Sequence, residues 1–512
     1  MTTIFDLALQ KAMQAAAGQP DTRHLLNDLI VPSERLAFVK DGDRWTQARL
    51  TAEAARLAAG LAGIGVQAGD RIALHLRNGP EIALAYLACF QLGAIAAPLN
   101  LRFKTAELED VLRRLRPAAY IGHAELYRLV SPIGTEILGA AVRYVVGEPE
   151  DGLARRWTLL HRHQTMSVLA DPDPDEPALL LSTSGSTGQP KLVAHSQATL
   201  ASIATRLTSL NVQAGDVVAF FMPMVHASGL VTFLTSLLAG ASLVMLDAND
   251  PDGILDAVEA HSCTYLAGLP TMLAHLMSCQ RHRPRNMSSL RVCRSGGDVP
   301  LPGQQEKFPS LFGVPLRNFW ASTEGAGSFT YGLRPGAVSR PIPGVEIRLV
   351  DADDRPVARG APGEMLLRGP HIALGYWTGP GEWGGFTDGW YRTGDIMRED
   401  EEGNFWFISR AKDLIVRGGS NISPVEVEQV LASHPGVRDA AVAGVPDPLL
   451  GQKVVGFVQL AEGVGAERLE EILHAASLRL ADYKLPERLL AVASIPRNGL
   501  GKIDRAQLAR IA

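Results

Sequence analysis

The chain has 512 residues and a formal net charge of −5, with 46% hydrophobic and 20% charged residues. This length exceeds what one ordinary core can hold, so we expect two or more domains. A weakly acidic balance argues against a general binder of nucleic acid or of anionic membranes. Cys89, Cys263, Cys279 and Cys293 show no C-x-x-C spacing, which indicates neither a zinc site nor a disulfide framework and favours a cytoplasmic protein.

No targeting or membrane segment is predicted. Residues 1–24 contain Asp6 and no sustained apolar core, unlike a secretory signal. Residues 217–246 contain no Asp, Glu, Lys or Arg and are long enough to cross a bilayer. Pro223, Gly229 and Gly240 divide this stretch, however, so we expect a strand, a helix and a strand in a buried parallel sheet.

The first half of the chain alternates helical and strand patterns. We expect helices over Leu50–Leu61 and Glu81–Leu92 and strands over Arg71–Leu76 and Ala94–Leu99. Such alternation is typical of βαβ units with parallel strands. The pattern resumes at Ser196, which can cap a helix that carries Leu200, Ile203, Leu207 and Leu210 on one face.

The pattern changes after Arg334, where short β-like runs separated by Gly and Pro continue to Trp406. About the last hundred residues predict a separate α+β unit. Ser423–Glu426 is a capping box with proline at the first helical position, so a helix is expected through about Ser433. Strands are expected over Ala440–Val445 and Lys453–Leu460, and the junction at Ser409–Asp413.

Residues 179–196, LLLSTSGSTGQPKLVAHS, join an apolar run to a loop of small and hydroxyl residues. Small residues let the backbone approach a ligand closely, successive N–H groups form an anion-binding concavity, and a lysine adds a point charge. A triphosphate cradle is therefore predicted from Thr183, Ser184, Gly185, Ser186, Thr187, Gly188 and Lys191. Pro190 excludes the ordinary P-loop, and a Gly/Ser-rich surface turn remains the alternative.

The loop resembles the motif T-S-G-T/S-T-G-x-P-K-G of the adenylate-forming superfamily, which includes acyl-CoA synthetases, luciferases and peptide-synthetase adenylation domains; it departs only at Leu192. The resemblance covers nearly the whole chain. It implies an α/β fold with a large N-terminal domain of parallel sheets flanked by helices plus a β-barrel-like part, and a small mobile α+β C-terminal domain. The implied divisions are residues 1–409, a hinge at 410–412 and a lid at 413–512.

Three further segments resemble the superfamily's acyl and adenine elements. FMPMVHASG, ending at Gly229, implies an acyl pocket gated by His226 and formed with Gly229, Gly297 and Trp320. RSGGDV implies nucleotide contacts from Gly296, Gly297 and Asp298. NFWASTE implies nucleotide contacts from Asn318, Phe319, Trp320, Ala321, Ser322 and Thr323, and a Mg²⁺ ion on Glu324.

The remaining motifs lie nearer the C-terminus. DGWYRTGDI resembles the ribose element and places Asp395 on the ribose hydroxyls. SRAKD resembles the hinge, which implies nucleotide contacts from Arg410 and nearby Phe407, a pivot at Lys412, and a pantetheine tunnel lined by Gly418 and Gly419. PRNGLGKIDR places Lys502 on the superfamily's catalytic lysine. Each motif alone is also typical of a surface turn or linker; their order along the chain favours the resemblance.

The resemblance implies an AMP-forming acid:CoA ligase that uses ATP, Mg²⁺ and coenzyme A, with Lys502, His226, Glu324 and Thr323 as catalytic residues. No aspartate in 217–246 could pair with a substrate ammonium, so a simple carboxylic acid is favoured over an amino acid. The lack of charge around His226, together with Trp320, predicts an apolar acyl group of modest size. The alternative is a stand-alone adenylation enzyme that loads a carrier-protein phosphopantetheine. A homodimer is left open; no nucleic-acid partner is expected.

Overall fold

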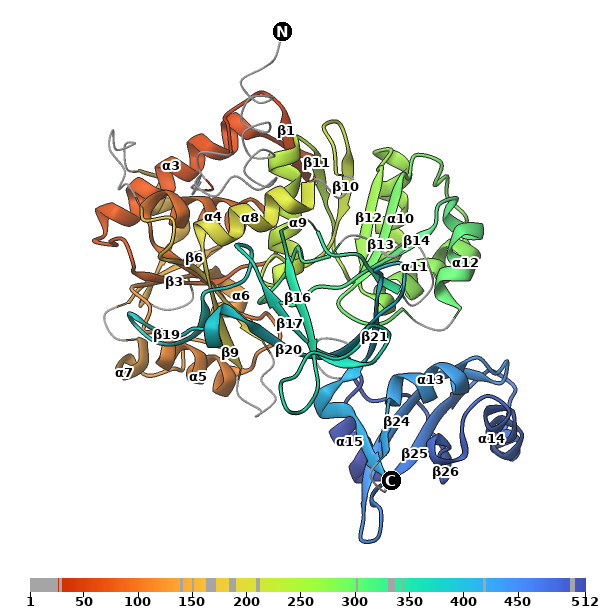
Figure 1. Ribbon diagram of the computed structural model, residues 1–512. Helices are drawn as coiled ribbons and strands as arrows, with labels where there is room; N and C mark the ends of the chain where they lie inside the picture. Colours follow the sequence, from red (N-terminus) through yellow and green to blue (C-terminus); the bar gives the residue numbers. More distant parts are fainter. Residues whose placement is uncertain are drawn as a thin grey trace.

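The computed structural model describes residues 26, 30–138, 141–149, 152–162, 172–183, 190–208, 212–300, 303–329, 337–342, 344–417, 420–497 and 502–512. Within these ranges, three sheets build a large N-terminal part and a fourth sheet builds a small C-terminal part (Figure 1). No helix in the described ranges has the length and apolar character needed to cross a membrane.

The first sheet has the order β14-β13-β12-β10-β11-β1-β2, and its described pairings are parallel apart from the β1–β2 hairpin. Its strands are β1 (Leu36–Lys40), β2 (Asp43–Thr46), β10 (Val217–Phe220), β11 (Ser242–Met245), β12 (Tyr265–Gly268), β13 (Val292–Gly296) and β14 (Leu316–Phe319). Helices cover both faces, and the central strands β10, β11 and β12 are accordingly mostly apolar and buried.

The second sheet has the order β19-β18-β9-β8-β4-β3-β5-β6-β7. Its strands are β3 (Arg71–His75), β4 (Ile95–Pro98), β5 (Ala119–His123), β6 (Val142–Val146), β7 (Ala154–Arg156), β8 (Pro177–Thr183), β9 (Lys191–Ser196), β18 (Gly375–Gly379) and β19 (Glu382–Gly384). Pairings are parallel from β7 to β8 and antiparallel from β8 to β19. The antiparallel end arises because the predicted phosphate loop joins β8 and β9 as a hairpin.

Helices fill the space between these two sheets and cover their outer faces (Figure 1). The inner helices are α3 (Gln47–Gly63), α4 (Pro80–Leu92), α8 (Gln197–Thr208) and α9 (Ala227–Ala239), whose apolar side chains share one core with both sheets. The outer helices of the second sheet are α5 (Thr105–Leu115), α6 (Ala124–Tyr127) and α7 (Thr135–Leu138). Those of the first sheet are α10 (Pro251–Ala260), α11 (Pro270–His282) and α12 (Gln304–Phe312). The result is five alternating layers of helix and sheet.

The local predictions for this region are confirmed. The charge-free stretch 217–246 forms β10, α9 and β11 instead of a membrane span. Ser196 caps α8, since its Oγ accepts the N–H of Thr199 at 3.1 Å. The side chains of Leu207 and Leu210, which we expected on the apolar face of this helix, lie outside the described residues.

The third sheet is antiparallel and carries the predicted β-rich region. Its order is β15-β21-β20-β17-β16, with strands β15 (Ala337–Ser339), β16 (Glu346–Val350), β17 (Gly363–Arg368), β20 (Tyr391–Glu399) and β21 (Phe405–Arg410). It packs on a separate apolar cluster that includes Trp320, Phe329 and Met397. The segment that contains Trp320 is thereby fixed between the first and third sheets.

The C-terminal part lies below β21 in Figure 1 and has its own sheet and two apolar clusters. Its elements are β22 (Ile415–Arg417), β23 (Ser420–Ile422), α13 (Pro424–Ala432), β24 (Val437–Asp447), β25 (Gly451–Leu460), α14 (Leu469–Ser477), β26 (Arg488–Ala491) and α15 (Arg505–Ile511). Ser423 caps α13, because its Oγ accepts the N–H of Glu426 at 3.2 Å, while the Glu426 carboxylate binds Lys484 and not the Ser423 backbone that the predicted capping box requires. A single 3-10 turn, Ala411–Asp413, connects this part to β21.

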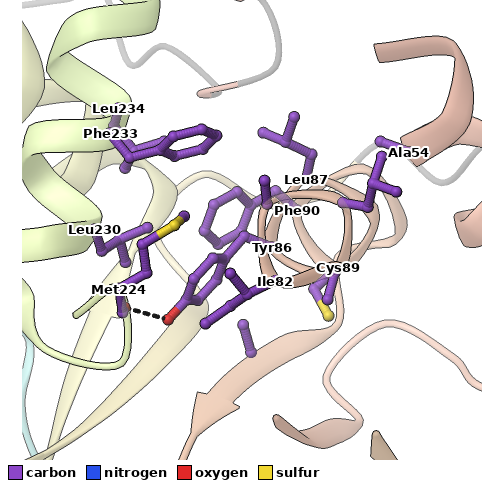
Figure 2. Packing of buried hydrophobic residues seen from close by; sticks show 14 of the residues in the cluster. Ala54, Ile82, Tyr86, Leu87, Cys89, Phe90, Met224, Leu230, Phe233 and Leu234 are labelled. Atoms are coloured by element: carbon purple, nitrogen blue, oxygen red, sulfur yellow. Dashed lines mark hydrogen bonds between the residues drawn. The ribbon is translucent and has the colours of Figure 1, made fainter. Parts of the chain in front are cut away.

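The core between the first two sheets also holds the loop that precedes α9. Tyr86 on α4 donates its hydroxyl to the carbonyl of Met224 at 2.7 Å (Figure 2). Asn78 donates from Nδ2 to the carbonyl of Met222 and accepts the N–H of Met224 on Oδ1, both at 2.8 Å. These bonds fix the backbone directly before His226, at the first turn of α9.

Replacing the buried Tyr86 by phenylalanine should lower the free energy of unfolding by about 1–2 kcal/mol, because the Met224 carbonyl loses its hydroxyl donor inside the core. Urea unfolding of the full chain measures the loss. Tyr483→Phe is the matched control, since Tyr483 is 43% exposed, and a change within about 0.5 kcal/mol is expected there. Equal effects of both substitutions would contradict the assignment.

Candidate active site

A cavity of about 1070 Å³ opens where the N-terminal sheets meet the hinge and the C-terminal part. Strands of the first sheet contribute their carboxyl ends, where open α/β sheets bind ligands. The predicted site residues that line it are Thr183, Lys191, His226, Gly296, Gly297, Phe319, Ala321, Ser322, Thr323, Glu324, Arg410, Lys412 and Lys502. Segments distant in sequence therefore converge on one space.

Two residues flank the predicted phosphate loop. Thr183 and Lys191 pair in register at the loop end of the β8–β9 hairpin, and Lys191 Nζ lies 4.5 Å from the centre of the Tyr376 ring. Both residues line the cavity. The rest of the predicted cradle (Ser184, Gly185, Ser186, Thr187 and Gly188) lies outside the described residues.

Glu324 presents a buried carboxylate next to this hairpin. The Tyr376 and Tyr391 hydroxyls each donate to one of its oxygens at 3.0 Å. Burial, followed by the negative charge of Glu324, raises the pKa of both tyrosines, so they remain hydroxyl donors.

This environment fits a Mg²⁺ ion. An ionised carboxylate has about four lone-pair sites, so Glu324 can accept both tyrosine hydroxyls and still offer an oxygen to a hard cation. Within the described ranges no cluster of three or more acidic, His or Cys side chains could hold a metal alone. Magnesium commonly binds through one or two carboxylates together with substrate phosphates and water, which suits a single glutamate.

Asp395 lies beneath the cavity wall and is 1% exposed. One of its oxygens accepts the indole N–H of Trp320 at 2.7 Å, and the other lies 2.8 Å from Arg410 Nε. Asp395 and Arg410 are register partners on β20 and β21. Burial raises the pKa of Asp395, and the charge of Arg410 opposes the rise. Gly394, directly before Asp395 on β20, lines the cavity with a φ of 72°, a conformation that favours glycine.

Six predicted site residues are not among the described residues that line the cavity: Gly229, Asp298, Asn318, Trp320, Asp395 and Phe407. A Cβ on Gly229 would lie 2.2 Å from the Pro223 carbonyl oxygen, so this glycine permits close packing at the start of α9. Trp320 donates to Asp395, and its ring packs edge-on to Phe329.

The other three have local partners. Asn318 is buried on β14, and its Oδ1 accepts the N–H of Phe319 at 3.0 Å. Phe407 packs on the apolar cluster of the third sheet. Asp298 is exposed and accepts the N–H of Val299 at 2.9 Å. Their motifs neighbour the cavity, whereas these three residues are not among the described residues that line it.

Lys502 is a residue of the C-terminal part that lines the cavity. Burial lowers its pKa, and the positive charges of Arg410 and Lys412 add to this shift, whereas Asp298 and Asp395 oppose it. A cation that is partly stripped of water interacts more strongly with a bound anion. Gly418 and Gly419, the expected pantetheine-facing pair, lie outside the described residues.

His226 is the residue that precedes α9, and its side chain lines the cavity. Burial lowers its pKa, with a further contribution from the charge of Arg102. The imidazole is therefore neutral at pH 7 and can position a carboxylate by hydrogen bonding.

Sequence reasoning missed three cations in the cavity wall, Arg102, Arg294 and Arg392. The expectation of an apolar acyl group stays a prediction; it considered residues 217–246 and Trp320 alone, while β13 and the segment at residue 102 contribute to the same wall. The signal for Arg294 was its place two residues before Gly296, on the strand that leads into the adenine motif.

Sequence reasoning also missed His195, which lies near the end of β9. It is 1% exposed, and its Nε2–H donates to the carbonyl of Thr323 at 2.8 Å. The bond ties β9 to the segment that carries Thr323 and Glu324. Its burial within β9 was not recognisable from a lone histidine in the sequence.

Known proteins share this architecture. A family model described as AMP-binding enzyme matches residues 15–377, and one described as AMP-binding enzyme C-terminal domain matches residues 426–502. A sulfoacetate–CoA ligase of Cupriavidus necator is 31% identical, with 99% of this chain and 98% of that protein covered. A salicyl-AMP ligase / salicyl-S-ArCP synthetase of Mycobacterium tuberculosis is 31% identical over 93% and 88%. The crystal structure of ATP-bound MatB from Rhodopseudomonas palustris superposes with a TM-score of 0.87 at 28% identity, covering 96% and 99%.

Stability should fall as the pH drops below about 6.5, because buried histidines resist protonation in the folded state. Burial lowers the pKa of His75 and His195 to about 4 and that of His371 to about 3. The unfolded chain takes up these protons first, so between pH 6.5 and 5 each histidine removes about 2 kcal/mol of unfolding free energy.

Urea unfolding at several pH values tests this expectation. His195→Gln should reduce the pH-dependent loss by about one histidine's share, that is, about 2 kcal/mol. The exposed His282 offers a control, since His282→Gln should leave the pH dependence unchanged. A pH dependence identical in all three proteins would contradict the role of His195.

Proposed function

The chain belongs to the AMP-binding, adenylate-forming enzymes, and we propose that within this family it is an AMP-forming acid:CoA ligase. The observation that carries the proposal is that Lys191, Glu324, Arg410 and Lys502, from four separate segments, line one cavity. Three cations and a carboxylate able to bind Mg²⁺ suit a substrate pair that combines a polyphosphate with an acid. The ATP-bound state of the similar MatB supports ATP as the nucleotide.

In the proposed first half-reaction, an oxygen of the substrate carboxylate attacks the α-phosphorus of ATP. A P–O bond forms to give acyl-AMP, and the bond to pyrophosphate breaks. Lys502 would lie between the carboxylate and the α-phosphate, two anions that otherwise repel each other. Such positioning can contribute on the order of 7–11 kcal/mol to lowering the barrier.

Charge also develops on the departing pyrophosphate. Lys191 and the loop between β8 and β9 would stabilise this charge from one side of the cavity. When bound to Glu324 and to phosphate oxygens, Mg²⁺ supplies further neutralisation of that charge. Asp395, through Arg410 and Trp320, would position the nucleotide from below the cavity wall, and His226 would orient the acid.

In the proposed second half-reaction, the sulfur of coenzyme A attacks the acyl carbonyl, the thiol loses its proton, and AMP leaves. We propose that the C-terminal lid, residues 413–512, rotates about a hinge at residues 410–412 between the two steps, relative to residues 1–409. The 3-10 turn Ala411–Asp413, one short connection, is where such a rotation would be absorbed. Rotation would withdraw Lys502 and turn the segment with Gly418 and Gly419 towards the thiol.

A carrier-protein acceptor is the second candidate. The observation in its favour is that the similar protein of Mycobacterium tuberculosis is named as a salicyl-S-ArCP synthetase as well as a salicyl-AMP ligase. Adenylation would be the same in both cases, and the two enzymes would differ only in the thiol that attacks acyl-AMP.

Lys502→Ala should lower acid-dependent pyrophosphate release by at least about 100-fold, because no other cation is proposed to bridge the carboxylate and the α-phosphate. Thioester formation from supplied acyl-AMP should be retained, since that step does not use Lys502. Lys484→Ala is the control, because Lys484 binds Glu426 at 2.7 Å and is not among the described residues that line the cavity. Equal loss in both half-reactions would reject the role of Lys502.

The acceptor is tested by measuring acid-dependent AMP release with free coenzyme A and, separately, with a phosphopantetheine-bearing carrier protein. The ligase proposal predicts saturable turnover with coenzyme A at least about tenfold above turnover with the carrier. A panel of short, medium, branched, alicyclic and aryl acids supplies the carboxylate. Turnover with the carrier protein alone would establish the second candidate instead.

A further inference from the structure

We propose that the acid taken by this enzyme carries a second anionic group, a carboxylate or a sulfonate, and that Arg294 binds it. The inference rests on the proposed ligase function and names the substrate class of the same site. Arg294 lies on β13, and its side chain lines the cavity.

Arg294 is held in a defined position at the cavity wall. Its Nη2 donates to Thr232 Oγ1 of α9 at 3.1 Å. The guanidinium carbon lies 5.1 Å from the centre of the Phe319 ring and 5.4 Å from that of Tyr265. Because an arginine fork presents five N–H donors and retains its charge when buried, it can keep such neighbours and bind an anion with the same group.

Charge in this part of the cavity favours an anion. Arg102 and His275 line the same cavity as Arg294. Among the described lining residues, the carboxylates are Glu324 and Glu364. Glu324 accepts two tyrosine hydroxyls, and Glu364 forms an ion pair with Arg392 at 2.5 Å. Both lining carboxylates are thus engaged by these partners.

The positions of His226 and Thr232 along α9 set the distance between the two anionic groups of the bound acid. His226 precedes this helix, where the proposed function places the reacting carboxylate, and Thr232 lies six residues further along. At 1.5 Å per residue, the positions of His226 and Thr232 are about 9 Å apart along the helix axis. An acid whose second anionic group lies within about 9 Å of the reacting carboxylate therefore fits better than a long apolar chain.

A purely structural role for Arg294, linking α9 to β13, would give a different result. Loss of a link would weaken activation of every acid by a similar factor. Loss of an anion site would change the preference between a dianionic acid and its monoanionic counterpart. The preference within each enzyme variant is therefore the informative quantity.

The experiment measures acid-dependent pyrophosphate release by the full-length enzyme with ATP and Mg²⁺. Glutarate, adipate and 4-sulfobutanoate are compared with pentanoate and hexanoate. The variants are Arg294→Met, Arg294→Lys and Arg317→Met. Arg317 is the matched control, because it pairs in register with Arg294 on the adjacent strand and is not among the described residues that line the cavity.

The wild-type kcat/KM should be at least about tenfold higher for the dianionic acids. Arg294→Met should lower the ratio of dianionic to monoanionic kcat/KM by at least about 30-fold, mainly through KM, as expected for loss of a charge-assisted pair. Arg294→Lys should keep part of the preference, and Arg317→Met all of it. The relative rates of carboxylate and sulfonate probes identify the second group.

Two results would overturn the inference while leaving the ligase proposal intact: preference of the wild-type enzyme for monoanionic acids, or an equal fall for both classes in Arg294→Met. The wild-type comparison is decisive even where Arg294→Met fails to fold. Absence of pyrophosphate release with every acid would reject both the proposed function and this inference.

Discussion

The buried carboxylate of Asp395 needs donors and positive charge, and the groups that supply them connect the parts of the site. Trp320 donates from the segment after the first sheet, and Arg410 pairs from the last strand before the hinge. A carboxylate left unpaired at 1% exposure would be strongly destabilising. These contacts join β20, the Trp320 segment and the end of β21 around one carboxylate.

From that fixed point, the site separates into regions of different charge. Glu324 is surrounded by tyrosine hydroxyls beside Lys191, whereas Arg102 and Arg294 belong to the part of the wall near His226. Lys502 comes from the far end of the chain, and burial lowers its pKa. Acid activation requires anions to be brought together, and the cavity wall distributes its cations over several segments, so that each anionic group can meet a different one.

Much of the fold could be predicted from the sequence. Apolar runs of strand length between amphipathic helices predicted the parallel sheets, and capping residues such as Ser196 and Ser423 predicted helix starts correctly. The directions of buried side chains could not be predicted as well. Trp320 and Gly229 have the motif positions expected for an acyl pocket, yet Trp320 bonds Asp395 and Gly229 packs on the Pro223 backbone. Which neighbour a buried side chain meets depends on contacts distant in sequence.

The sequence by itself determined the family and the alternation of helix and strand, because these depend on local periodicity and on motifs of adjacent residues. The tertiary structure alone decided which side chains share the cavity. Arg294 lies on β13 and His226 precedes α9, so the two line one cavity only when β13 and α9 pack together. Charge in a binding site is a sum over neighbours in space, and a linear motif contains no information about that sum.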